Sequence, residues 1–88
     1  MSDRDAVEAA ILEAVHRRGA GRTLCPSEVA RAMAPDDWRG LMPSVRAAAA
    51  RLAADGAIAV TQRGNPVDPA TARGPIRLGL STTPGRSS

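Results

Sequence analysis

Apolar residues recur at helical spacing in three stretches of the chain. In the first stretch, which begins at Ser2 or Asp3, they fall at i, i+3, i+4, i+7 and i+8, the period of an amphipathic helix. These residues are Val7, Ala10, Ile11, Ala14 and Val15. Gly19 is expected to end this helix. A second, shorter helix is predicted to start at Cys25-Pro26, since proline is tolerated at the first helical position, and to end near Ala34, ahead of Pro35.

The third stretch predicts a helix from Pro43 to Asp55, stopped by Gly56. Its inward face follows from the period of 3.6 residues and consists of Val45, Ala48, Ala49 and Leu52, extended by Leu41 and Met42. The segment Asp36–Trp38 just before it is expected to form a separate helical turn that packs the indole over the core.

After Gly56 the period changes from helical to alternating. Ile58 and Val60 face one side and Thr61 the other, as in a half-buried strand. The alternation returns at Ile76, Leu78 and Leu80, with a loop over residues 64–74 between the two strands. Residues 22–24 are expected to add a short strand.

This order of elements is typical of a winged helix-turn-helix. We predict an α+β fold, mainly α with a small β-hairpin: three helices plus a two- or three-stranded antiparallel wing sheet. The domain is expected to cover residues 1–80, and residues 81–88 are expected to form a disordered tail.

The composition of the chain limits the possible folds but says little about function. With 88 residues the chain forms one domain, and Trp38 is its single Phe, Tyr or Trp. All 12 basic residues are arginine. Codon bias in a GC-rich genome explains that usage, so a pI of about 11.0 is not proof of nucleic-acid binding. The distribution says more: residues 1–38 carry five Arg and seven acids, net −2, whereas residues 39–88 carry seven Arg and two acids, net +5.

Several classes of chemistry are excluded by what the sequence lacks. Cys25 is the single cysteine of the sequence and His16 the single histidine. This excludes an intrachain disulfide and a four-ligand structural zinc site. A catalytic cysteine needs an activating base, and no Ser/His/Asp set, phosphate-binding Gly-rich loop or paired carboxylates appear. We therefore expect no enzymatic activity, cofactor, metal or small-molecule ligand. The acidic N-terminus does not resemble a signal peptide and no segment would span a bilayer, which predicts a cytoplasmic protein.

The outward face of the third helix is poor in groups that recognise bases. Arg46 and Arg51 flank a strip formed by Ala47, Ala50 and Ala54. The arginines suit phosphates, but an alanine methyl contacts only the methyl of thymine. The face therefore either binds DNA with little sequence preference or packs against protein.

The loop after the first long strand is the better candidate for contact. Arg63, Arg73 and Arg77 can bracket a phosphate or reach a minor groove, and Asn65 can both donate and accept hydrogen bonds. With helical positions included, the predicted nucleic-acid contacts are Arg39, Arg46, Arg51, Arg63, Asn65, Arg73 and Arg77. The alternative is a rigid structural loop in which Asp68 caps a turn and pairs with Arg73.

Three segments carry a family resemblance: CPSEVAR, the WRxLMPxVR pattern from Trp38 to Arg46, and GNPVDPATARGPIRL from Gly64 to Leu78. Over about Val7 to Leu80 the chain resembles a bacterial family of small, uncharacterised domains of unknown function, whose members look like winged-helix proteins. The resemblance implies the fold and carries over no catalytic residue.

Two functions therefore stand as hypotheses. The first is double-stranded DNA binding, as a small transcription regulator. The second is a protein-interaction or homodimerisation module that uses the Ala-rich face of the third helix without binding nucleic acid. A third, an accessory domain for an RNA- or nucleotide-modifying enzyme, is opposed by the lack of aromatic stacking groups other than Trp38.

Overall fold

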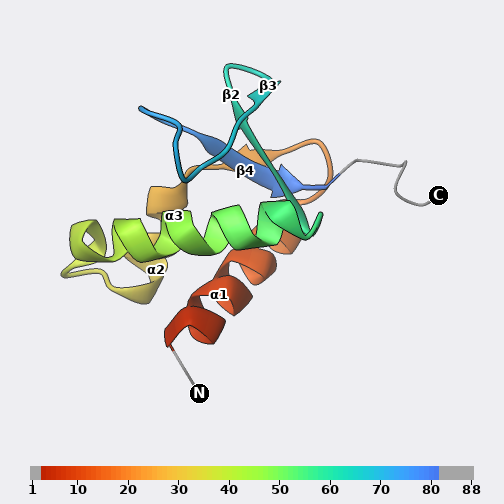
Figure 1. Ribbon diagram of the computed structural model, residues 1–88. Helices are drawn as coiled ribbons and strands as arrows, with labels where there is room; N and C mark the ends of the chain where they lie inside the picture. Colours follow the sequence, from red (N-terminus) through yellow and green to blue (C-terminus); the bar gives the residue numbers. More distant parts are fainter. Residues whose placement is uncertain (1–2, 82–88) are drawn as a thin grey trace.

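The computed structural model describes residues 3–81, with side chains from Asp5 onward. Its elements are α1 (Asp3–Arg18), β1 (Thr23–Leu24), α2 (Pro26–Met33), α3 (Trp38–Ala54), β2 (Ile58–Gln62), β3 (Asn65–Pro66) and β4 (Arg77–Leu80). In Figure 1 the helices pack together below the sheet. The predicted α+β fold with the layout of a winged helix-turn-helix is confirmed, but the sheet has four strands where two or three were expected. The predicted disordered tail lies, apart from Ser81, outside the described residues.

The first two helices form where the sequence predicted them. Val7, Ile11 and Val15 are at most 2% exposed and form the buried stripe of α1. The helix ends at Arg18, and the next residue, Gly19, adopts a left-handed φ of 94° and donates its N–H to the carbonyl of Val15. In α2, Pro26 occupies the first turn.

The third helix begins earlier than expected, because α3 starts at Trp38 and contains Pro43 in its interior. The predicted start at Pro43 and the separate turn at Asp36–Trp38 were therefore wrong. Pro43 has no N–H to donate to the carbonyl four residues earlier, so one helical hydrogen bond is missing there. We attribute the continuation of the helix on the N-terminal side of Pro43 to packing, because Trp38, Leu41 and Met42 all lie against the core on the first turns of the helix.

The sheet has the strand order β1-β4-β2-β3, and every neighbouring pair is antiparallel. The central strand is β4, in which Leu78 lies opposite both Leu24 of β1 and Val60 of β2. A Cβ at the neighbouring Gly79 would lie 3.1 Å from the carbonyl oxygen of Arg22. Glycine at this position therefore lets β1 approach β4 closely.

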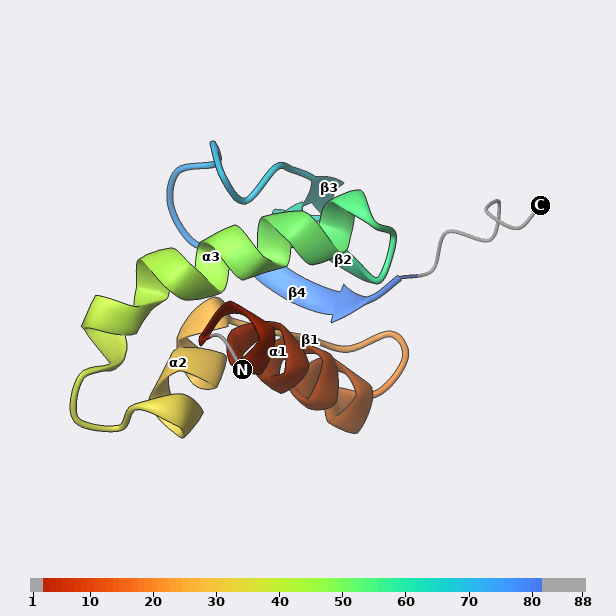
Figure 2. The same cartoon turned by 60° about the horizontal axis from the view of Figure 1, so that its bottom comes forward.

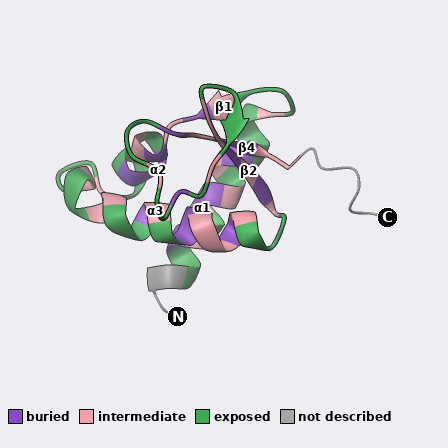
Figure 3. Cartoon of the chain, turned by 45° about the horizontal axis from the view of Figure 1, so that its top comes forward, coloured by how far each residue is buried: buried purple, intermediate pink, exposed green. Residues whose placement is uncertain are grey.

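The core lies where the helices and the sheet meet, as the buried residues in Figure 3 show. The inward face predicted for the third helix is confirmed: Val45, Ala48 and Ala49 are fully buried and Leu52 is 5% exposed. No buried polar or charged residue is found among the described residues. The fold is therefore held mainly by aliphatic packing.

The loop between β3 and β4 turns back toward α3, as Figures 1 and 2 show. Pro69 is buried, and the carbonyl of Ala72 accepts a hydrogen bond of 2.7 Å from Nη2 of Arg46. Asp68 caps the turn in this loop, because its Oδ1 accepts the N–H of Ala70 at 2.9 Å. This part of the rigid-loop alternative is confirmed, but within residues 3–81 no ion pair joins Asp68 to Arg73.

Candidate nucleic-acid interface

A hollow of about 700 Å³ lies in the wing, the name we give to the β2–β3 hairpin together with the loop that leads into β4. Four of the seven predicted contact residues line it: Arg63, Asn65, Arg73 and Arg77. Arg63, Asn65 and Arg73 are exposed, whereas Arg77 is half-buried. Among the described residues that line the hollow none is acidic, so its charge is uniformly positive.

Gln62 holds the two sides of this hollow together. It is the last residue of β2, and its Nε2 donates to the carbonyl of Arg73 at 2.5 Å and to the carbonyl of Pro75 at 3.1 Å. Both acceptors belong to the segment that leads into β4. The amide therefore fixes the backbone that carries Arg73 against the hairpin that carries Arg63. Sequence reasoning assigned Gln62 no role, because a partner eleven residues away gives no local pattern.

Arg77 forms the inner wall of the hollow and is tied to β1. Its Nε donates to Oγ1 of Thr23 at 3.0 Å, Nη2 donates to the carbonyl of Thr23 at 3.2 Å, and Nη1 lies 2.8 Å from Sγ of Cys25. These contacts join the start of β4 to the neighbouring edge strand β1 and to Cys25 just after it. Arg77 therefore adds positive charge to the hollow while its guanidinium stays fixed.

Glu28 lies beside this group, at the start of α2. Its carboxylate accepts the backbone N–H of Cys25 at 3.0 Å and pairs with Arg18. The hydrogen bond from Cys25 is the largest cause that holds the pKa of Glu28 below its ordinary value of 4.5, and the charges of Arg18 and Arg77 add to it against desolvation.

We therefore expect Glu28→Gln to destabilise the fold at neutral pH and not in acid. A lowered folded-state pKa contributes stability above the unfolded value, near 4.5, and loses it as the pH falls through the folded value. Because the carboxylate is 43% exposed, we expect a loss of about 0.5–1 kcal/mol at pH 7. Thermal unfolding across acid pH should show the two proteins converging. Glu13→Gln, in an ion pair exposed by more than two thirds, is the matched control and should change little; a pH-independent difference for Glu28→Gln would contradict this role.

The arginines of α3 have partners within the protein. Nε of Arg51 lies 2.5 Å from Oε2 of Glu8 and joins α3 to α1, and Arg46 holds the loop through Ala72. Arg39 is exposed and its guanidinium carbon lies 4.7 Å from the ring centroid of Trp38. Arg39 and Arg46 border a second hollow of about 550 Å³, between α3 and residues 69–70. Arg51 borders neither the hollow in the wing nor the hollow beside residues 69–70.

A further arginine was missed by the sequence reasoning. Arg31 of α2 places its guanidinium carbon 4.3 Å from the ring centroid of Trp38, so the single indole holds two guanidinium groups. The contact joins α2 to the first turn of α3. Because the loop between the helices includes Asp36 and Asp37, this corner carries charges of both signs.

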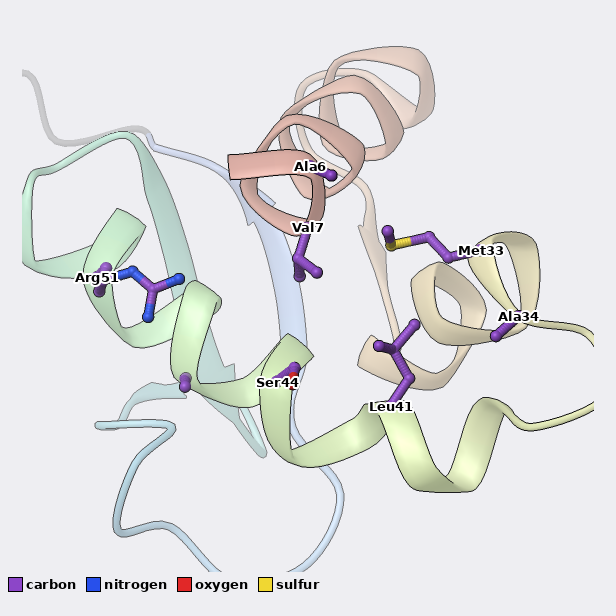
Figure 4. A pocket seen from close by; sticks show the side chains of 8 residues that line it. Ala6, Val7, Met33, Ala34, Leu41, Ser44 and Arg51 are labelled. Atoms are coloured by element: carbon purple, nitrogen blue, oxygen red, sulfur yellow. The ribbon is translucent and has the colours of Figure 1, made fainter. Parts of the chain in front are cut away.

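The Ala-rich face of α3 borders an apolar groove of about 430 Å³ between α1, α2 and α3. Figure 4 shows Met33 and Leu41 reaching into the space beside Val7, with Arg51 at the opposite end. Ala47 also lines this groove and is exposed. By contrast, Ala50 and Ala54 face the loop at residues 66–70. The strip of methyl groups is thus divided between two surfaces.

A family model described as "Protein of unknown function (DUF3253)" matches residues 4–81. The chain belongs to this family. The expected membership of a domain family of unknown function is confirmed, while the bacterial origin stays a prediction. No curated protein is significantly similar to the chain.

Two further observations bear on the chemistry of this DUF3253 domain. Its described helices include none with the length and apolar character needed to cross a membrane. Within residues 3–81, no three His, Cys, Asp or Glu side chains cluster closely enough to hold a metal ion.

Proposed function

We propose that this DUF3253 domain is a cytoplasmic, non-enzymatic DNA-binding domain that contacts the phosphate backbone of a duplex through its wing. The observation that carries the proposal is the hollow lined by Arg63, Arg73 and Arg77 without an acidic residue among its described lining. Exposed arginines are the groups that displace the counterions condensed on a duplex, which is the main source of affinity in nonspecific binding.

The arginines divide into contact groups and structural groups. Arg63 and Arg73 are exposed, and none of the carboxylates described from Asp5 onward pairs with them. Arg77 strengthens the positive potential from a fixed position. Arg51 is left out of the proposed surface, because its charge is compensated by Glu8 across a half-buried contact.

The edge of α3 supplies a second point of contact. Arg39 is exposed and borders the hollow beside residues 69–70, close to Arg46. Since the alanines between the helical arginines offer methyl groups alone, α3 adds little base recognition through the major groove. We therefore expect this domain to bind the DNA backbone with weak sequence preference and not to recognise a defined base sequence.

The test is duplex binding by fluorescence anisotropy at two salt concentrations. With about three phosphate contacts, from Arg39, Arg63 and Arg73, the slope of log affinity against log salt is about −2.7. Affinity for a random-sequence duplex should then fall about 40-fold between about 50 and about 200 mM salt. Absence of binding at the lower concentration, or affinity that salt leaves unchanged, would overturn the proposal.

The alternative is a protein-interaction module, including a homodimer, that uses the Ala-rich face of α3. The apolar groove supports it, since Ala47 is exposed there and Met33 is 37% exposed. Light scattering with size-exclusion chromatography separates the two proposals. A mass that rises with concentration, together with no duplex binding, is the outcome that favours the alternative.

A further inference from the structure

Arg63 occupies a backbone conformation that arginine rarely adopts. Gln62 and Asn65 pair directly across the β2–β3 hairpin, so the turn consists of Arg63 and Gly64, with φ of 54° and 83°. Positive φ at both central residues is the pattern of a type I′ turn, for which Asn-Gly is strongly preferred. Among the described residues Arg63 is the one non-glycine with positive φ.

This choice of residue disfavours the folded state. A residue with a bulky side chain meets steric conflict in the left-handed region, which asparagine tolerates far better. The Arg63 side chain is exposed, and among the side chains described, from Asp5 to Ser81, none forms a hydrogen bond or ion pair with it that would compensate for the conflict. A strained residue without a structural partner points to a role outside the fold.

The position of Arg63 suits a narrow groove. A two-residue turn is the slimmest end that a hairpin can have, and Arg63 lies in it with no acidic residue among the described lining of the hollow behind it. Arg73 lines the same hollow and can meet a flanking phosphate, while Arg77 adds positive potential from its fixed position. The minor groove of A·T tracts is narrow and has an enhanced negative potential that attracts inserted arginine, whereas a G·C pair adds an amino group there.

We propose that Arg63 inserts into the minor groove of duplex DNA and gives this domain a preference for A·T-rich sequence. The inference rests on the proposed function, because it requires the wing to meet a duplex. It differs from that function in assigning base-composition selectivity to one residue. Arg73 then supplies affinity that is independent of sequence.

The test compares Arg63→Asn with Arg73→Gln on two duplexes of equal length, one an A·T tract and one G·C-rich. The wild-type protein should bind the A·T duplex about 10-fold more tightly, the discrimination typical of a single groove contact. Arg63→Asn should reduce that ratio to near unity. The same variant should raise Tm by about 4 °C, because asparagine relieves the turn. Arg73→Gln should weaken binding to both duplexes equally and leave the ratio intact.

The outcomes separate this inference from the proposed function. Duplex binding without an A·T preference, or an A·T preference that survives Arg63→Asn, overturns the inference and leaves backbone binding standing. A Tm that falls in Arg63→Asn overturns the argument from strain. Absence of all duplex binding overturns the proposed function and this inference together.

Discussion

Replacing Leu78 by alanine is expected to lower the free energy of unfolding by about 2–5 kcal/mol. Leu78 is fully buried in the central strand β4, opposite Leu24 and Val60. The substitution removes buried methyl groups and leaves a cavity that the neighbouring strands cannot close without losing their register. For a small domain this is a large fraction of the total stability, so Tm should fall by at least about 10 °C.

Chemical denaturation of the two proteins measures this loss, and Met33→Ala provides the matched control. Met33 is also a large aliphatic residue but is 37% exposed, so its truncation should change the stability by less than about 1 kcal/mol. Equal losses for the two variants would contradict the place of Leu78 in the buried core.

The second large effect concerns binding. Simultaneous replacement of Arg63 and Arg73 by alanine should lower duplex affinity more than about 10-fold at low salt and reduce the magnitude of the salt slope by about 1.8, which corresponds to two lost phosphate contacts. Both side chains are exposed and form no ion pair with the side chains described between Asp5 and Ser81, so the fold should be retained. Circular dichroism confirms folding, and anisotropy across salt concentrations gives the slope.

A control for net charge accompanies this double variant. Arg17→Ala combined with Arg22→Ala removes the same charge from exposed positions at the end of α1 and in the loop after it. If binding depends on the wing, this control should retain most of the affinity and nearly all of the slope. Equal losses in the two double variants would assign binding to overall charge instead of to a site.

Much of the fold was predictable from local pattern. The spacing of apolar residues, together with the Gly and Pro residues that mark the ends of elements, predicted α1, α2, the inward face of α3 and the strands around Ile58 and Leu78. The beginning of α3 was not predictable, because a proline is a local signal for a helix start and the packing that extends the helix to Trp38 is tertiary. The same holds for β3, whose two residues pair with β2 inside a stretch that composition marks as a loop.

The candidate site was predictable as a set of residue types and not as a geometry. All seven predicted contact residues lie on α3 or in the wing. Which of the arginines remain free to bind a ligand depends on interaction partners that are distant in the sequence. Glu8 compensates Arg51 across 43 positions of sequence, and Thr23 fixes Arg77 across 54. The local spacing of residues does not predict contacts between side chains so far apart in the sequence. The sequence already favoured the loop over the helix, and the structure narrows the loop's candidate contacts to the exposed Arg63 and Arg73.

The proposed function requires that the wing, more than the outer face of α3, meets the DNA. Titration of ¹⁵N-labelled protein with a duplex at low salt, followed by amide chemical shifts, distinguishes the two surfaces. The largest shifts are expected at residues 62–65 and 73–77, with small changes at the exposed Ala47 of α3. Shifts concentrated along the outer face of α3, with the wing unchanged, would contradict it.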